Sequence, residues 1–196
     1  MQVSVCEAEL RNMEREEQLV LVNENDRAIG VGEKIHTHVI GALHRAFSVF
    51  IFNSTGQLLL QKRSSTKYHS RGLWSNTCCG HPRPGESIIE ASRRRLTEEM
   101  GFDCAVKKVF EFIYHAKLDN GLCEHEYDHV LVGNFDESPT PNQEEVDDWK
   151  WADLTTIKLD IHTNPDQYTY WFRISLDGVC RSIPSLRVVQ RANAKL

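Results

Sequence analysis

Short runs of apolar residues, separated by turn-forming segments, occupy the first half of the chain. Residues 19–22 (LVLV) and 46–52 (AFSVFIF) are rich in β-branched and aromatic residues, which predicts two strands. The turn residues 53–56 (NSTG) join the second run to residues 58–63 (LLLQKR), and this order predicts a β-hairpin. Residues 64–86 hold several Gly and Pro, so we expect a loop there.

The strongest helix signal follows that loop. Ser87 with Glu90 three residues later forms a capping box, in which each side chain satisfies a backbone N–H at the start of a helix. Gly101 is well placed to end the helix, because glycine adopts the left-handed conformation without steric cost. The pattern therefore predicts a helix from Ser87 to about Met100.

The second half of the chain alternates less regularly. Apolar runs predict further strands at residues 106–114, 124–135 and 149–152. Asp153 and Asp166 can each cap a helix, at about residues 154–160 and 167–177. Strands on both sides of one strong helix predict an α/β domain of the α+β kind, with a mixed sheet between helices, and not a doubly wound fold.

Length and composition set the domain organisation. A chain of 196 residues, 40% hydrophobic and 26% charged, is long enough for one domain with its own core. We expect that domain at residues 19–177, an N-terminal extension at 1–18 whose first 17 residues are helical or frayed, and a C-terminal segment at 178–196 that belongs to the same domain. No apolar run approaches the ~20 residues of a membrane span. The Glu- and Arg-rich start argues against a signal peptide.

Charge and cysteine content narrow the class of partner. The net charge is −5, and no block of basic residues indicates binding to nucleic acid or a membrane. The six Cys form no CxxC pair, so we expect reduced thiols in a cytoplasmic protein. We expect a monomer, and an oligomer stays open. The surplus of His and Cys leaves packing, metal binding or catalysis as their roles.

Residues 80–102 (GHPRPGESIIEASRRRLTEEMGF) place Glu98 and Glu99 in the last turn of the predicted helix. Carboxylates there oppose the helix dipole at a cost of up to about 1 kcal/mol, which a bound metal ion would offset. Alternatively, Arg94–Glu98 and Arg95–Glu99 are i,i+4 ion pairs on a solvated face. These residues alone leave both interpretations open.

The same segment resembles the Nudix box, G-x5-E-x7-R-E-U-x-E-E-x-G-U with U apolar, which carries acidic side chains toward a divalent cation that holds a diphosphate. Every fixed position from Gly80 to Phe102 matches except one, because Arg95 stands where the box usually has Glu. The resemblance implies a Nudix-type sheet between helices and diphosphate binding, while Arg95 places a cation where the hydrolases use a carboxylate to hold metal.

Metal-capable side chains occur in four other segments: KIHTH (34–38), LHRAF (43–47), TCCGHP (77–82) and EHEY (124–127). On a strand, Glu124 and Glu126 point to the same face and His125 to the opposite one. Two adjacent carboxylates repel unless a cation or a shared proton lies between them. Three His and two carboxylates together would suit Zn, Mn or Fe.

These segments, together with their neighbours in the sequence, resemble those of a known enzyme family. LHRAFSVFIFN (43–53), LLLQKRS (58–64), LWSNTCCGHPRPGES (73–87), the box helix and GLCEHEYDHVL (121–131) closely resemble the type 1 isopentenyl-diphosphate Δ-isomerases, a branch of the Nudix superfamily. The resemblance covers about residues 19–175. It implies interconversion of isopentenyl diphosphate and dimethylallyl diphosphate in isoprenoid biosynthesis.

The resemblance implies two metal sites. One is a five-ligand site for Mn²⁺ or Zn²⁺, formed by His38, His44, His81, Glu124 and Glu126. His36 also lies near the first position, but the four-residue step from Lys34 and the spacing to His44 favour His38. Glu99 and the backbone of Cys79 correspond to ligands of a Mg²⁺ ion that bridges the protein and the diphosphate.

The resemblance also assigns the substrate contacts and the catalytic groups. The diphosphate clamp corresponds to Lys34, Arg63, Lys67 and Arg95, and Trp171 corresponds to the tryptophan over the isoprenoid carbons. Cys79 corresponds to the catalytic cysteine, while its neighbour Cys78 is interpreted as a packing residue. Tyr114 corresponds to the tyrosine paired with the catalytic carboxylate, Glu126.

Moving the double bond requires a proton added at one carbon and another removed two carbons away. We expect Glu126 with Tyr114 to protonate the alkene and Cys79, as a thiolate with a lowered pKa, to remove the other proton. The reverse division stays open. Two other functions compete with this one: a Nudix hydrolase of a nucleoside diphosphate derivative, and an inactive Nudix-fold binding module.

Overall fold

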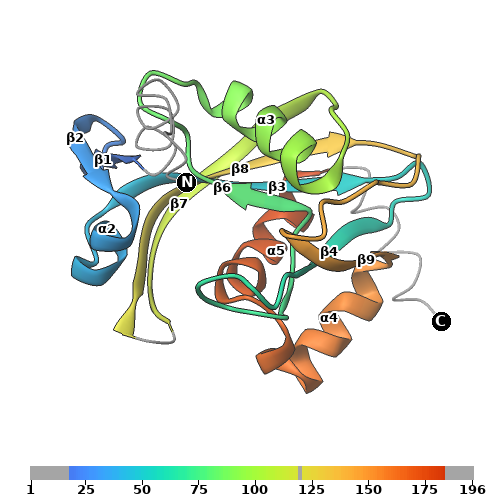
Figure 1. The fold of residues 1–196 in the computed structure, drawn as a ribbon. Helices are drawn as coiled ribbons and strands as arrows, with labels where there is room; N and C mark the ends of the chain where they lie inside the picture. Colours follow the sequence, from blue (N-terminus) through green and yellow to red (C-terminus); the bar gives the residue numbers. More distant parts are fainter. Residues whose placement is uncertain (1–17, 119–120, 184–196) are drawn as a thin grey trace, which may run out of the picture.

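The structure is a computed structural model that describes residues 18–118 and 121–183 (Figure 1). The expectation for residues 1–17 lies outside the described residues. The strands are β1 (Gln18–Val22), β2 (Ala28–Glu33), β3 (His44–Phe52), β4 (Leu58–Arg63), β5 (Trp74–Ser75), β6 (Cys78–Gly80), β7 (Val106–Lys117), β8 (Cys123–Asn134) and β9 (Val146–Ala152). The helices are α2 (Lys34–Ile40), α3 (Ile88–Met100), α4 (Leu154–Thr163), the 3₁₀ helix η2 (Pro165–Gln167) and α5 (Tyr170–Ser182).

Strand β3 is the centre of the sheet. It pairs in parallel with β8, from His44 opposite Glu126 to Phe52 opposite Asn134, and antiparallel with the short β6. Strand β7 pairs antiparallel with β8 on its other edge. Because β3 has neighbours on both edges and layers on both faces, its near-continuous apolar sequence is buried along almost its whole length.

The predicted hairpin of residues 46–63 forms only at its turn. Phe52 lies opposite Leu58, and the Asn53 N–H donates to the Gln57 carbonyl at 3.0 Å. Beyond that pair the strands diverge, and β4 pairs along its length with β9. The reason is that β6 and β8 already occupy both edges of β3, so β4 finds its partners elsewhere.

Helices cover both faces of the sheet, which confirms the predicted mixed sheet between helices (Figure 1). On one face, Leu96 and Met100 of α3 pack against Phe47, Val49 and other outward residues of β3. On the other face, α5 and α4 pack against the opposite side of the same strands through Phe172, Leu176 and Ile157 among others. Burying each such side chain contributes roughly 1.5–3 kcal/mol.

Helix α3 begins and ends as the sequence predicts. The Ser87 side chain accepts a hydrogen bond from the Glu90 N–H, and the Glu90 carboxylate accepts one from the Ser87 N–H. Gly101 has φ +74°, and a Cβ there would lie 2.2 Å from the Thr140 carbonyl oxygen, so the position requires glycine. The Thr140 N–H in turn donates to the Met100 carbonyl at 3.1 Å. The last turn of α3 is therefore held firmly in place.

Other elements differ from the prediction. β2 and α2 were not predicted, because their exposed, Gly-containing sequence has no clear apolar period. The predicted loop at 64–86 contains the short strands β5 and β6.

Asp166 does not cap a helix. It lies in η2, and α5 starts at Tyr170 and continues to Ser182. The Thr169 N–H donates to the Trp74 carbonyl at 3.0 Å, and Tyr168 forms an isolated parallel β-bridge with Trp74. This tertiary contact keeps Tyr168 and Thr169 extended. Within the described ranges, no helix has the length and apolar content needed to cross a membrane.

Candidate active site

A cavity of about 440 Å³ opens between α3, the loop at residues 64–73 and the ends of β6 and β8. Its lining contains most of the residues singled out from the sequence: Lys34, Arg63, Lys67, Cys79, His81, Arg95, Glu99, Glu124, Glu126 and Trp171. His38, His44 and Tyr114 are buried directly behind this lining and contact Glu124 or Glu126. The fold thus brings together residues from across most of the chain.

Strand register builds the floor of the site. Glu126 on β8 lies opposite His44 on β3 and opposite Tyr114 on β7. The three side chains therefore share one face of the sheet, and the Tyr114 hydroxyl donates to Glu126 Oε2 at 2.7 Å. Glu124 and Glu126 face this cavity, while His125 lies on the opposite side with its Nδ1 2.9 Å from the Gly41 carbonyl. The predicted alternation of this segment is confirmed.

Five side chains form a buried cluster: His38, His44, His81, Glu124 and Glu126. One ligand atom from each lies within 4.8 Å of those of the others. Helix α2 brings His38 into the cluster and leaves His36 exposed, so His38 is the member from this segment. The four-residue step from Lys34 has a helical cause, because His38 Nδ1 lies 2.7 Å from the Lys34 carbonyl oxygen.

Backbone contacts orient the rings of His38 and His44 in the way that metal-binding histidines require. His38 Nδ1 faces the Lys34 carbonyl and His44 Nδ1 faces the Ala42 carbonyl at 2.9 Å. A carbonyl only accepts, so each Nδ1 carries the hydrogen, and in the neutral ring each Nε2 presents a lone pair. Both Nε2 atoms, together with Glu124 Oε2, are buried without a hydrogen-bond partner in the described part of the chain.

These lone pairs converge on carboxylates. His38 Nε2 lies 3.2 Å from Glu124 Oε2, and His44 Nε2 lies 3.7 Å from Glu126 Oε1. Lone pairs and carboxylates at such distances repel, and a divalent cation among them would convert the repulsion into coordination. The residues present therefore fit a bound divalent metal ion.

The two carboxyl groups differ in protonation behaviour. Burial and the neighbouring Glu126 raise the pKa of Glu124. Burial also acts to raise the pKa of Glu126, but its contacts with His44 and His81 outweigh burial and hold that pKa well below its usual value. Burial lowers the pKa of His81 to about 3, so this ring is neutral. Neutral imidazoles and an ionised carboxylate are the forms that bind metal.

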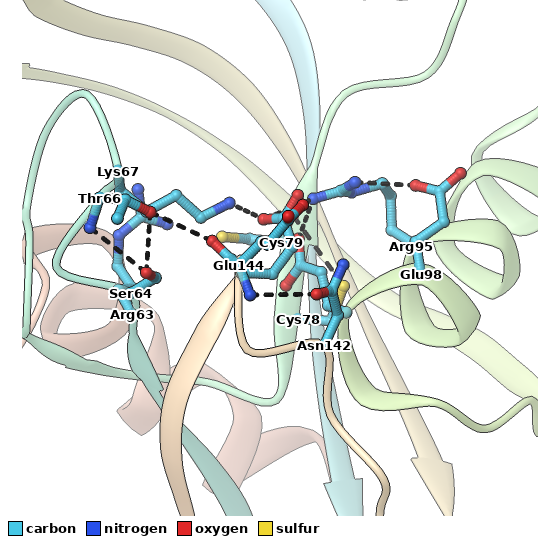
Figure 2. A network of polar contacts seen from close by, with 12 residues as sticks. Arg63, Ser64, Thr66, Lys67, Cys78, Cys79, Arg95, Glu98, Asn142 and Glu144 are labelled. Atoms are coloured by element: carbon cyan, nitrogen blue, oxygen red, sulfur yellow. Dashed lines mark hydrogen bonds and ion pairs between the residues drawn. The ribbon is translucent and has the colours of Figure 1, made fainter.

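Basic side chains line the opposite part of the cavity. Figure 2 shows Arg63 and Lys67 approaching from one side and Arg95 of α3 from the other, with Cys79 between them. Lys34 also lines the cavity and lies 5.0 Å from the centre of the Tyr68 ring. The structure therefore brings together the four residues of the predicted diphosphate clamp.

Arg95, which stands where the Nudix box usually has Glu, is surrounded by carboxylates. Its guanidinium donates to Glu98 Oε2 at 2.7 Å, ion-pairs with Glu99 and lies 3.3 Å from Glu145 Oε2. The i,i+4 ion pairs Arg94–Glu98 and Arg95–Glu99 both form, as the plainer interpretation predicted. However, Glu99 is buried and Arg95 lines the cavity, so this part of the helix is not a solvated face.

The two neighbouring cysteines point in opposite directions. Cys78 is fully buried and packs in the core beneath α3, whereas Cys79 lines the cavity. Burial raises the pKa of Cys79 to about 12, although Arg63 acts to lower it. The expectation that nearby cations lower this pKa is therefore corrected: with the charges of the described residues alone, Cys79 is a neutral thiol.

Trp171 enters the cavity from α5. It is buried, its indole N–H donates to Ser75 Oγ at 3.1 Å, and the Arg63 guanidinium lies 5.3 Å from its ring centre. The hydrogen bond fixes the ring orientation, and the ring face turned to the cavity is apolar and rich in π electrons. Such a face can stabilise a nearby cation.

The sequence did not indicate several residues of the site. Tyr68 and His69 follow Lys67 and line the cavity, and Glu145 ion-pairs with Lys67. No local signal in the sequence marks His69, which lies two residues after Lys67 in the loop. No spacing pattern marks Glu145, since it lies outside the box and reaches the site only through the pairing of β4 with β9.

Comparisons with known proteins agree with this geometry. The sequence matches the NUDIX domain family over residues 42–172. A protein of Aromatoleum aromaticum named isopentenyl-diphosphate Delta-isomerase 2 is 52% identical over 170 residues, which cover 86% of this chain and 90% of the relative. A Photorhabdus laumondii protein of the same name is 55% identical over 164 residues, 84% of this chain and 93% of the relative.

Solved structures match the fold. A Deinococcus radiodurans crystal structure is similar with a TM-score of 0.61 and 20% identity, over 76% of this chain and 90% of that one. A MutT protein from Methanosarcina mazei is similar with a TM-score of 0.59 and 19% identity, over 71% and 94% of the two chains. At these identities the likeness shows the fold alone.

The cluster predicts stabilisation by metal. Adding Mn²⁺ or Zn²⁺ at about 100 times the dissociation constant stabilises the metal-free protein by about 2.7 kcal/mol, a rise in Tm of roughly 5–10 °C. Glu124→Gln abolishes most of that rise in a thermal melt, because it removes an anionic ligand. His36→Ala is the matched control and leaves the rise intact. A full rise in the Glu124→Gln protein would contradict binding at this cluster.

Proposed function

The chain belongs to the Nudix family and, within it, to the isopentenyl-diphosphate Δ-isomerases, and we propose that it interconverts isopentenyl diphosphate and dimethylallyl diphosphate in this cavity. One observation carries the proposal: a thiol and a carboxylate that accepts a hydrogen bond from a tyrosine line one cavity with a cationic wall and a tryptophan face. Each of these parts has a task in moving a double bond by one carbon.

The reaction needs two groups that exchange protons with carbon. Cys79 on β6 and the Tyr114–Glu126 pair on β7 and β8 flank the central strand β3. One group delivers a proton to the alkene and the other accepts the proton released from the allylic position, and the roles exchange in the reverse direction. The raised pKa of Cys79 suits a thiol that donates a proton, and the lowered pKa of Glu126 suits a carboxylate that accepts one, in one direction of the reaction.

The intermediate between the two proton transfers is a tertiary carbocation, which water would capture. Trp171 presents its ring to the carbons of the substrate, and a cation on a desolvated tryptophan face gains about 2 kcal/mol or more. The buried position of Trp171 and Tyr114 also keeps water from that end of the cavity.

We propose that His38, His44, His81, Glu124 and Glu126 hold one Mn²⁺ or Zn²⁺ ion. Bound there, the ion would supply positive charge that keeps Glu124 and Glu126 side by side and holds Glu126 in a fixed orientation. The residues themselves prepare the site, because their backbone hydrogen bonds already set the two inner imidazoles with Nε2 toward the centre.

We propose that the diphosphate lies against Lys34, Arg63, Lys67 and Arg95, and that Glu99 would hold a Mg²⁺ ion that supplies further positive charge to the diphosphate. Burial acts to raise the pKa of Glu99, but Arg95 and Lys67 outweigh burial and keep it lowered, so this carboxylate is ionised and suited to Mg²⁺. Gln61 donates to the second oxygen of Glu99 at 2.8 Å and fixes the direction of this carboxylate.

The cysteines that the structure describes form no disulfide among themselves, which supports a cytoplasmic protein. We propose that the protein acts as a monomer.

A Nudix hydrolase of a nucleoside diphosphate derivative is the alternative, and Arg95 argues against it. Its guanidinium sits among Glu98, Glu99 and Glu145, so it places a cation where the Nudix box usually has a further carboxylate that helps to hold metal. An inactive binding module is also disfavoured, since the buried cluster and Cys79 are both intact.

The neighbouring cysteines provide a matched test of catalysis. Cys79→Ala lowers turnover of isopentenyl diphosphate by at least about 1,000-fold, while binding of the diphosphate changes little, because the thiol exchanges a proton but does not hold the anion. Cys78→Ala costs roughly 1 kcal/mol of stability and leaves turnover within a few-fold of wild type. Near wild-type turnover in Cys79→Ala would contradict the assignment. Phosphate release from nucleoside diphosphate derivatives, measured in parallel, would instead favour the hydrolase.

Arg95→Glu tests the diphosphate clamp. Replacing a cation with an anion beside the diphosphate raises KM by about 10- to 100-fold and changes kcat little, as expected for a group that binds substrate and transition state alike. Arg93→Glu, on the exposed side of the same helix where Arg93 pairs with Asp103, serves as the control and leaves both constants unchanged. A fall in kcat with an unchanged KM in Arg95→Glu would show that Arg95 does not bind the diphosphate in the ground state.

A further inference from the structure

His69 is a buried histidine at the site that the mechanism does not use. It lies in the loop at residues 64–73 between β4 and β5, and it is 4% exposed. Its Nε2 lies 3.2 Å from Glu124 Oε1, and its ring meets the Trp171 ring edge to face with centroids 5.9 Å apart. His69 is not one of the five clustered residues, and it lines the cavity together with Glu124.

The polar contacts of His69 select one tautomer. Its Nδ1 lies 3.1 Å from the Ser70 hydroxyl, which can donate to it. Its Nε2 faces a carboxylate oxygen, which can only accept. With the hydrogen on Nε2, both contacts are favourable. With the hydrogen on Nδ1, the Nε2 lone pair would face the carboxylate and repel it.

The two oxygens of Glu124 consequently have separate partners. Oε1 faces His69, whereas Oε2 faces His38 and His44 and has no hydrogen-bond partner among the residues that the structure describes. An imidazole N–H 3.2 Å from Oε1 attracts that oxygen, and this attraction favours the rotation about the Cγ–Cδ bond that directs Oε2 at the two imidazoles. Restraint of this kind acts on metal binding without contact to the metal.

We propose that His69 is a positioning residue that orients Glu124 for the metal cluster and joins that cluster to the substrate wall. The proposal rests on the metal site of the proposed function and adds a residue outside it.

The connection to the substrate wall runs through the backbone of the same loop. Arg63 donates from Nη2 to the His69 carbonyl and from Nε to the Ser70 carbonyl, each at 3.2 Å. Tyr68 packs between Lys34 and His38, and the centroids of the Tyr68 and His38 rings lie 5.9 Å apart. Three consecutive residues therefore touch both the metal cluster and two cations of the diphosphate clamp.

The test measures metal affinity directly, without turnover. Zn²⁺ and Mn²⁺ are titrated in turn into metal-free full-length protein against a competing chelator. His69→Leu, which fills similar space without a donor, binds each ion about 10- to 100-fold more weakly than wild type. His69→Gln places an N–H near the position of Nε2 and restores affinity to within a few-fold. His36→Leu removes an exposed histidine beside the site and leaves affinity unchanged.

The outcomes separate this proposal from its premise. Equal affinity of wild type and His69→Leu overturns the positioning role and leaves the metal site intact. No metal binding by wild type overturns the proposed metal site itself. If His69→Leu does not fold, His69→Gln is compared with His69→Asn, whose shorter amide cannot reach Glu124. Tighter binding by the Gln protein supports the proposal, and equal binding by the two overturns it.

Discussion

Two carboxylates side by side on strand β8, Glu124 and Glu126, are the constraint on which the site depends. They are buried among three imidazoles, and without a cation their negative charges would oppose folding of this part of the sheet. The fold tolerates the arrangement because the register of β7, β8 and β3 places Tyr114 and His44 on either side of Glu126. The same register that stabilises the sheet therefore brings the proposed acid–base pair and the proposed metal ligands to one point.

A second charge arrangement distinguishes this cavity from that of a hydrolase with the same helix. The box helix directs acidic side chains into the cavity, and Arg95 lies among them as an internal counter-ion. In the proposed function, the cationic wall holds the diphosphate, and Cys79, Glu126 and Trp171 in the same cavity carry out the proton exchange. The overall charge of −5 conceals this local excess of positive groups.

Local signals in the sequence were sufficient for some elements and not for others. The capping box and Gly101 define α3 because the residues that start and end the helix act within a few positions of each other. Asp166 was wrong as a cap, because Thr169 is held extended by Trp74, almost a hundred residues away. β2 and α2 lack an apolar period, and α2 is positioned by Glu33, whose carboxylate accepts hydrogen bonds from the Ile35 and His36 N–H groups.

The residues of the site differ in the same way, because some are marked by local sequence signals and others depend on tertiary contacts. Residue type and spacing favoured His38 over His36, since the i,i+4 contact with Lys34 is local. Glu145 and His69 could not be derived, because their roles depend on loops that tertiary pairing brings to the cavity. The high pKa of Cys79 was also out of reach, since burial, which sequence does not specify, outweighs the visible basic residues.

The central claim is that a metal-dependent proton exchange at carbon takes place in this cavity. The most direct measurement is incubation of the protein with isopentenyl diphosphate in deuterated water, with the product followed by NMR before and after treatment with EDTA. The account predicts dimethylallyl diphosphate that carries deuterium in a methyl group, loss of conversion on chelation, and recovery when Mg²⁺ and Mn²⁺ or Zn²⁺ are returned. Conversion that continues at the same rate after complete removal of metal would contradict it.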